Sequence, residues 1–304
     1  MKIERESLEG FLVVASAFLI WGASPIYWKT LAEVPAFEIL MHRVIWSFLF
    51  LTPIVAVQRR WGEFMAAVSN MRTLLILFAT TLFVATNWLI FIWSVNNNRV
   101  LQASLGYFIN PLFSVLLGMV FLKERLRPLQ VTALLLAAAG VAYLTLRLGS
   151  FPWIALSLAV SFGFYGLVRK VAPVSPVVGL FVETLLLMPP AVGYLIYLNG
   201  LGQGAFIRLG IKIDLLLMAS ALVTALPLLL FILGTKRLHL STVGFLQYIV
   251  PSCFFLIAVF VFHEVVSSAQ IGAFAFIWSA LALYTADSMV FYRLLAKISV
   301  KDCS

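Results

Sequence analysis

Ten apolar stretches, each about long enough to cross a bilayer, fill nearly all of this 304-residue chain. A hydrocarbon core of about 30 Å is crossed by about 20 apolar residues in an α-helix. Backbone polar groups in lipid must be paired within the protein, so the stretches are helices or barrel strands. Barrel strands alternate in polarity over about ten residues, which these unbroken runs exclude. We therefore predict an all-α membrane protein with transmembrane helices over residues 10–28, 36–57, 73–94, 101–122, 128–146, 151–168, 176–198, 214–233, 240–262 and 269–292.

Composition agrees with this class, because 63% of the residues are hydrophobic and 11% are charged. A soluble domain has about 25% charged residues. Of the two cysteines, Cys253 lies within a span and Cys303 at the C-terminus, far apart in the expected geometry. We therefore expect no disulfide, no metal site and no cofactor.

The net charge of +9 is interpreted as setting orientation, and no nucleic-acid partner is expected. If the N-terminus is cytoplasmic, fifteen of the 21 basic residues fall on the cytoplasmic side and five on the other. The remaining one, Arg43, lies inside a span. An excess of Lys and Arg in cytoplasmic loops is the positive-inside pattern. It predicts that both termini are cytoplasmic, with the lipid bilayer around the spans.

The second half of the chain repeats the first. Three pairs are 140 residues apart: Pro111 and Pro251, Glu124 and Glu264, Gln130 and Gln270. Two more are 141 residues apart: Gly22 and Gly163, Lys29 and Lys170. Each copy holds five helices, an odd number, so the second copy enters the membrane from the opposite side. This predicts two inverted five-helix repeats, residues 1–147 and 148–304, a plan that recurs in secondary transporters with the substrate site between the repeats.

Long motifs carry a resemblance to a known family. They include WGASPIYWK (residues 21–29), EILMHRVIWS (38–47), residues 87–97, LGYFINP (105–111), SFGFYGLVRK (161–170) and LSTVGFLQYIVP (240–251). Over essentially its full length the chain resembles RarD, a branch of the EamA-type drug/metabolite transporter superfamily. The resemblance implies ten helices in two repeats around a central cavity, and a permease of the bacterial inner membrane; analogy favours export. The family commonly has a glutamate where this chain has Gln102, which cannot carry a proton.

Arg43 lies about seven residues into its span, roughly 10 Å deep at 1.5 Å per residue. An ionised group there costs about 2.5–3.5 kcal/mol, and such groups usually face protein or water. Arg43 is therefore either a cavity wall that binds an anionic or polar group, or a structural arginine held by carbonyls or a glutamate.

Glu183 takes the position of Arg43 in the second repeat, 140 residues later. The two should lie at similar depths from opposite surfaces, so we expect each near one mouth of the pathway and not in contact. Glu183 is then either a group that couples transport to protons, or one half of a static ion pair with a cytoplasmic-side Arg or Lys.

Other residues are candidates for gates. Glu38 and His42 are four residues apart and share one helix face. They form either a proton relay at the outer gate or an ordinary structural contact. Pro111 and Pro251 each free a carbonyl one turn earlier, which suits a hinge but is also common structure in membrane helices. Glu124 and Glu264 end a span just before another helix, so we expect each to cap that following helix.

Polar and aromatic side chains within the spans are candidates for the substrate cavity. Tyr107, Asn110 and Ser114 share one face of the fourth span, and Gln247 and Tyr248 are their counterparts in the ninth. These bind substrate or hydrogen-bond neighbouring helices. Five further residues either line the substrate cavity or pack one helix against another: Trp21, Tyr27, Asn87, Trp88 and Tyr165. Aromatic walls with few charges suit neutral or weakly charged amphipathic compounds.

The predicted function is a secondary-active transporter that moves a small organic metabolite or drug by alternating access, and not an enzyme. The alternatives are an intramembrane enzyme and a passive channel for small polar molecules. The sequence has no Walker motif, no His-Glu-x-x-His motif, no paired intramembrane Asp and no filter sequence. The fifth and tenth spans carry few polar groups and are interpreted as scaffold, which leaves them available as a homodimer face.

Overall fold

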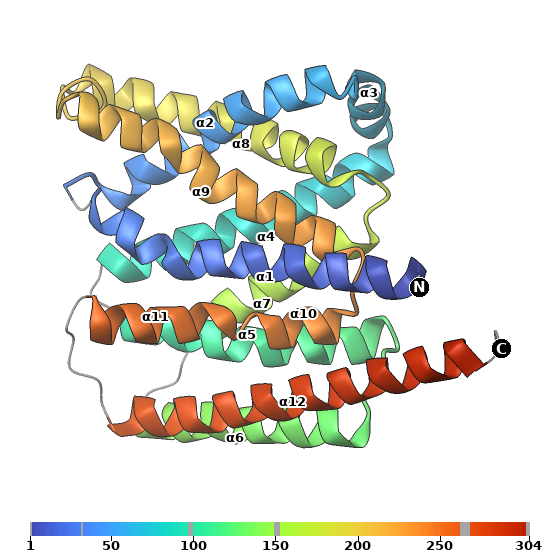
Figure 1. The fold of residues 1–304 in the computed structure, drawn as a ribbon. Helices are drawn as coiled ribbons and strands as arrows, with labels where there is room; N and C mark the ends of the chain where they lie inside the picture. The colour runs from blue at the N-terminus through green and yellow to red at the C-terminus, as the bar shows by residue number, and fades with distance from the viewer. Residues whose placement is uncertain (1, 32, 97–99, 149–152, 262–267, 302–304) are drawn as a thin grey trace.

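The computed structural model describes residues 2–31, 33–96, 100–148, 153–261 and 268–301, and within these ranges helices are joined by turns and short loops (Figure 1). The helices are α1 (Lys2–Lys29), α2 (Ala36–Val57), α3 (Trp61–Ser69), α4 (Met71–Asn96), α5 (Val100–Phe121), α6 (Pro128–Leu148), α7 (Trp153–Val171), α8 (Pro176–Gly200), α9 (Ile211–Thr235), α10 (Leu240–Leu246), α11 (Ile249–Phe260) and α12 (Ser268–Lys301). Glu264 and the side chain of Gln102 lie outside the described part.

Within the described residues, eight segments are long and apolar enough to cross a membrane. Two shorter apolar helices, Gly106–Phe121 and Ile271–Asp287, lie within α5 and α12. The all-helical, multi-pass class is therefore confirmed. The count of ten spans and the division into two repeats stay predictions at this point.

Two local features differ from the sequence-based expectation. The segment between the second and third predicted spans contains the nine-residue helix α3, too short to span a bilayer. The ninth predicted span is not one continuous helix, because α10 ends at Leu246 and α11 begins at Ile249. Pro251 lacks the N–H that would bond the Gln247 carbonyl one turn earlier. That carbonyl instead accepts from the Val250 N–H at 3.1 Å, in a tighter turn at the break.

The long helices run side by side along one axis, and α1 begins at the same end of the bundle at which α12 finishes (Figure 1). We call this the terminal end, and the end that holds the α8–α9 connection the opposite end. The principal neighbours are α5 with α7, α6 with α12, α1 with α9, α2 with α8 and α9, α5 with α10, α4 with α7, and α1 with α11. Helices that are distant in sequence therefore form most of the packing.

Small residues allow some of these helices to approach closely. A Cβ at Gly234 of α9 would lie 2.1 Å from a methyl carbon of Val14 and 2.9 Å from the Gly10 carbonyl oxygen on α1. A Cβ at Gly244 of α10 would lie 2.7 Å from the Pro111 carbonyl oxygen on α5. Glycine is needed at both positions because the facing backbone occupies the space of a side chain.

Candidate functional site

Arg43 lies in α2 among side chains from three other helices. Its Nε donates to Thr224 Oγ1 of α9 at 2.8 Å, and its Cζ lies 4.8 Å from the ring centre of Trp28 and 4.9 Å from that of Trp88. The side chain is only partly buried. Within the described residues, no acidic side chain lies within 4 Å of Arg43, and Nη1 and Nη2 have no hydrogen-bond acceptor.

Two tyrosines complete the aromatic surroundings of Arg43. The Tyr27 hydroxyl donates to the Leu216 carbonyl on α9, and its ring meets that of Trp28 edge to face. The Tyr107 ring of α5 packs edge to face against Phe91 of α4, one turn after Trp88. We use the name arginine pocket for the group of side chains formed by Tyr27, Trp28, Arg43, Trp88 and Tyr107. Trp28 of this group was not among the residues selected from sequence. Thr224, which bonds Arg43, was not selected either.

Glu183 lies in a different cluster, toward the terminal end. Its carboxylate forms an ion pair with Arg169 of α7, with Nε 3.4 Å from Oε1, and both side chains are fully buried. Thr80 of α4 donates to Oε1 at 2.6 Å, and the Tyr165 hydroxyl donates to Oε2 at 3.3 Å. Of the two interpretations of Glu183, the geometry is that of an ion pair with a basic residue. Its partner is Arg169, and not Arg43.

Two lysines cap each other's helices at the same end. Lys170, at the end of α7, donates to the carbonyls of Thr235 and Leu238, where α9 finishes. Lys236, just after α9, donates to the carbonyls of Ala172 at 3.0 Å and Val174 at 2.5 Å, where α7 finishes. The last carbonyls of a helix have no partner within it, and a cation is favourable there. Sequence reasoning counted both lysines toward membrane orientation and matched Lys170 with Lys29 in the repeat, but it predicted no capping role for either.

Glu124 caps a helix, but not the expected one. Its carboxylate accepts from the Leu240 N–H at 2.6 Å and the Ser241 N–H at 2.9 Å, at the start of α10 in the other half of the chain. At the start of α6 a backbone N–H is capped by Gln130 instead, because the Gln130 side chain accepts from the Arg127 N–H at 3.0 Å. Burial would raise the pKa of Glu124, but the nearby His239, with Nδ1 3.7 Å from Oε1, and the hydrogen bonds from the α10 amides outweigh it and lower the pKa to about 2.

Glu38 and His42 are both buried near the start of α2, but they do not form a hydrogen bond. Glu38 Oε1 lies 3.9 Å from His42 Nε2 and accepts from the Ala205 N–H at 2.6 Å. The carboxylate therefore holds the α8–α9 connection at the opposite end. The second carboxylate oxygen, Oε2, is buried and has no hydrogen-bond partner in the part of the chain that the structure describes.

The other candidates are divided between packing and polar contacts. Trp21 packs with Phe18, Phe162 and Phe231, away from the arginine pocket. Asn87 donates to the Leu158 carbonyl at 2.9 Å and to Ser161 at 3.0 Å. Gln247, at the α10–α11 break, accepts from Ser114 at 3.3 Å. Among the described residues, the buried Asn110 Oδ1 and Tyr248 hydroxyl have no hydrogen-bond partner. Pro111 lies inside α5, which continues through it, so an interruption accompanies only Pro251 of this pair.

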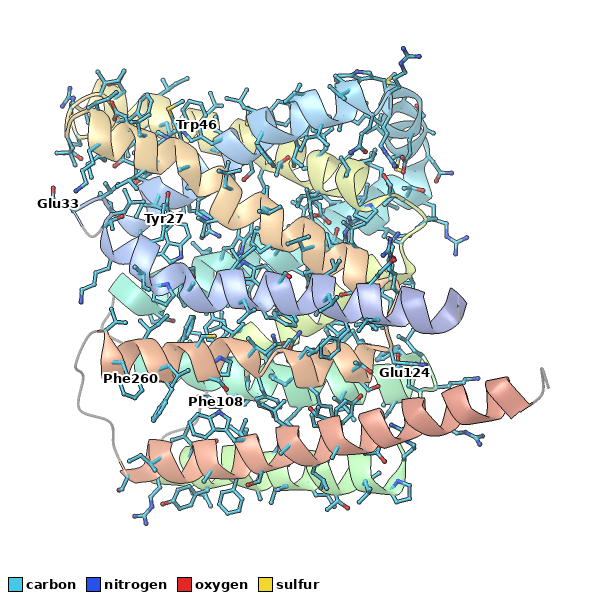
Figure 2. All side chains as sticks on the ribbon, in the orientation of Figure 1. Tyr27, Glu33, Trp46, Phe108, Glu124 and Phe260 are labelled. Atoms are coloured by element: carbon cyan, nitrogen blue, oxygen red, sulfur yellow. The ribbon has the colours of Figure 1, made fainter. Side chains whose placement is uncertain are left out.

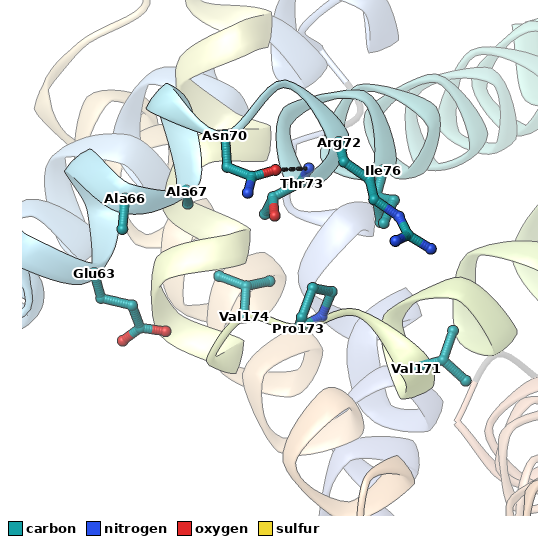
Figure 3. Close-up of a pocket in the computed structure, with 10 residues that line it drawn as sticks. All are labelled: Glu63, Ala66, Ala67, Asn70, Arg72, Thr73, Ile76, Val171, Pro173 and Val174. Atoms are coloured by element: carbon teal, nitrogen blue, oxygen red, sulfur yellow. Dashed lines mark hydrogen bonds between the residues drawn. The ribbon is translucent and has the colours of Figure 1, made fainter.

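A cavity of about 700 Å³ lies between α3, the start of α4 and the α7–α8 connection (Figure 3). None of the residues selected from sequence lines it. Two of its polar side chains are already engaged: Asn70 accepts from the Thr73 N–H, and Glu63 accepts from the Ser175 N–H. Tyr27 of the arginine pocket and Glu124 lie toward opposite ends of the bundle (Figure 2). Within the described ranges, no three His, Cys, Asp or Glu side chains gather to hold a metal ion.

Comparison with known proteins identifies the family. Residues 8–146 match the EamA-like transporter family. The chain is 48% identical to an uncharacterized transporter of Vibrio cholerae, over 94% of this chain and 95% of that protein. It is 45% identical to the protein RarD of Salmonella typhimurium, over 95% and 98%. This chain belongs to the RarD branch of the EamA family.

Membership of the RarD branch makes the chain a multi-pass membrane transporter. A more distant relative, 33% identical, is named the chloramphenicol-sensitive protein RarD of Pseudomonas aeruginosa. A crystal structure of a protein that is 20% identical superposes with a TM-score of 0.69, over 91% of this chain and 97% of that one. At that identity the superposition supports the fold alone. The RarD relatives extend over the arginine pocket, the Glu183 cluster and the Glu124 cap, so all three lie in the shared region.

Proposed function

We propose that this protein is a secondary-active transporter of the bacterial inner membrane that moves a small organic molecule by alternating access. It has ten membrane helices in two inverted repeats, residues 1–147 and 148–304. The first repeat comprises α1, α2, α4, α5 and α6. The second comprises α7, α8 and α9, then α10 with α11 as one interrupted span, then α12. The short helix α3 lies outside this scheme.

The observation that carries the proposal is the exchange symmetry of the helix contacts. The counterparts are α1 and α7, α2 and α8, α4 and α9, α5 and the pair α10–α11, and α6 and α12. Exchanging counterparts turns the contact of α5 with α7 into a contact of α10 and α11 with α1. It turns the contact of α4 with α7 into a contact of α9 with α1. Likewise α4 against α8 becomes α9 against α2. The pairs α2 with α8, α5 with α10, and α6 with α12 each join counterparts. All of these contacts occur. Inverted repeats arranged in this way support alternating access, because exchanging the two halves interchanges the two faces.

Individual residues support the same scheme. Arg43 and Glu183 are counterparts, and each makes a hydrogen bond to a threonine on the counterpart helices α9 and α4. Arg43 bonds Thr224, while Glu183 bonds Thr80. Both contacts join one repeat to the other, at different ends of the bundle. If the contacts around Arg43 break while those around Glu183 stay formed, or the reverse, the pathway opens to one side of the membrane only.

Orientation and direction belong to the proposal as well. The excess of basic residues at the terminal end supports a cytoplasmic location for both termini. The arginine pocket then lies toward the periplasm, and the Glu183 cluster toward the cytoplasm. Export is supported by family analogy. The homodimer stays a prediction.

The first experiment tests access from the two sides. In a variant whose native Cys253 and Cys303 are replaced by serine, Thr224→Cys is labelled with a membrane-impermeant maleimide in right-side-out and in inside-out vesicles. We expect labelling from both sides. A disulfide between Glu38→Cys and Ala205→Cys should block labelling only from the periplasmic side. Labelling from one side alone contradicts alternating access.

The second experiment tests transport itself. Metabolites and chloramphenicol sensitivity are compared between deletion and overexpression strains, and any compound whose distribution changes is tested with protein reconstituted in proteoliposomes. Saturable flux with counterflow is expected of a carrier. A flux that rises linearly with concentration and shows no counterflow identifies a channel, and chemical conversion of the compound identifies an enzyme.

A further inference from the structure

We propose that the arginine pocket binds a singly charged organic anion, a carboxylate joined to a flat apolar body. This inference rests on the proposed function for its role in transport, and it narrows the substrate class. Composition alone suits neutral or weakly charged compounds. The contacts of Arg43 point to a negative charge.

The first support is the unused half of the Arg43 guanidinium. Nε is bonded to Thr224, and the group lies within 5 Å of the ring centres of two tryptophans. Within the described residues, Nη1 and Nη2 have no acceptor, and neither is among the polar atoms sealed from solvent. A guanidinium presents parallel N–H groups that match the two oxygens of a carboxylate. The free edge of Arg43 is therefore available for such a group.

The second support is charge. Arg169 is paired with Glu183 and Arg127 with Asp287, whereas within the described part of the chain no acidic side chain lies within 4 Å of Arg43. Tryptophan rings attract a cation through their quadrupole but carry no net charge. The pocket thus retains one positive charge inside the bundle. A ligand with one negative charge neutralises it, and a doubly charged phosphate ester would leave an excess.

The third support is the wall of the pocket. Trp28 and Trp88 face the guanidinium, and the Tyr107 ring packs edge to face with Phe91 and Phe254. These rings come from α1, α4, α5 and α11. Flat aromatic surfaces bind flat apolar groups, and a small number of polar groups orients the ligand. The pocket is therefore suited to an organic acid rather than to an inorganic anion.

The experiment uses full-length purified protein in detergent and matched probes. Benzoate, phenylacetate and 1-naphthoate are each compared with the neutral amide of the same shape, and acetate serves as the acid without a flat body. Binding is measured by titration calorimetry. We expect at least one aromatic acid to bind at least tenfold more tightly than its amide, and acetate to bind more weakly than that acid. If no acid binds more tightly than its amide, the proposal is wrong.

Variants then locate the binding. Arg43→Gln should weaken binding of the preferred acid at least tenfold and leave the amide unchanged. Arg147→Gln is the matched control, because Arg147 also lies over an aromatic ring, Tyr143, but is exposed on α6. Trp88→Leu should weaken binding of the aromatic acid more than it weakens binding of acetate. If Arg43→Gln does not fold, Arg43→Lys keeps the charge but loses the paired N–H groups, and should bind the acid more weakly. Unchanged acid binding in these Arg43 variants overturns the proposal.

The two proposals fail in different ways. Counterflow of some solute without any preference for acids would retain the transporter and reject the anion site. Acid binding that depends on Arg43, in a protein that shows neither counterflow nor two-sided labelling, would retain the anion site and reject the transporter.

Discussion

Arg169 of α7 is held in place by contacts with α8. It is fully buried, paired with Glu183, and bonded to the Pro176 carbonyl at 3.1 Å. Its third contact is steric: a Cβ at Gly179 would lie 2.1 Å from Nη1 and 2.6 Å from Cζ. The guanidinium is thus fitted against the backbone of α8, and its position depends on the missing side chain.

Gly179→Ala should therefore destabilise the protein. The added methyl group displaces the guanidinium from Glu183 and leaves a buried charge without its partner, at a cost of about 3 kcal/mol. We expect a lower melting temperature in detergent. Gly193→Ala is the control on the same helix, since nothing lies within 4 Å of its Cβ. Equal melting temperatures for the two variants would contradict the packing described here.

Glu124 should make stability depend on pH. Its pKa is lowered from 4.5 to about 2, so the folded state binds the proton less readily than the unfolded state. The stabilisation is then present above pH 4.5 and is lost as the pH falls toward 2. Glu124→Gln keeps an acceptor without the charge and should lower stability by about 1–2 kcal/mol at neutral pH. The difference from wild type, followed by thermal unfolding, should shrink below pH 4.5; a constant difference would refute the assignment.

At the scale of elements, the break between α10 and α11 distinguishes otherwise similar helices. α2 contains Pro53 and α5 contains Pro111, yet both are continuous. At Pro251 the chain separates into two helices, next to Gln247, which contacts Ser114 across the repeats. A break at this place gives the interrupted span a point at which its two parts can move independently.

Pro251→Ala tests this point. The alanine N–H can bond the Gln247 carbonyl and make the helix continuous, which contributes about 1 kcal/mol. We expect slower amide hydrogen exchange over residues 246–252, with slower transport once a substrate is known. Pro53→Ala in α2 should leave exchange in that segment unchanged. Exchange that is equally fast in Pro251→Ala and in wild type would show that the proline does not cause the break.

At the scale of the whole molecule, polar contacts between distant segments repeatedly join residues before 148 to residues after it. The pairs are Glu38 with Ala205, Arg43 with Thr224, Thr80 with Glu183, Asn87 with Leu158, Ser114 with Gln247, and Glu124 with Leu240. Each half therefore supplies partners for buried polar groups of the other. A half by itself would leave these groups unpaired in lipid.

The two halves should accordingly be stable only together. Residues 1–147 and 148–304, co-expressed as separate chains, should co-purify and unfold in one transition. Either chain expressed by itself should be degraded or aggregate, because its charged and polar groups lack partners. Purification of one half as a folded species that is as heat-stable as the pair would contradict this account.

The sequence by itself determined the membrane class, the approximate positions of the helices and the family, because hydropathy and long motifs are properties of contiguous segments. It also selected Arg43 and Glu183, since a charge within an apolar span is conspicuous wherever it lies. Only the tertiary structure decided which charges are neutralised: Arg169 pairs with Glu183, while no carboxylate within the described part of the chain lies within 4 Å of Arg43. The same holds for Glu124, which caps α10 instead of α6. Apolar spans carry little information about register or neighbours, so these partners depend on helices that meet only in the folded bundle.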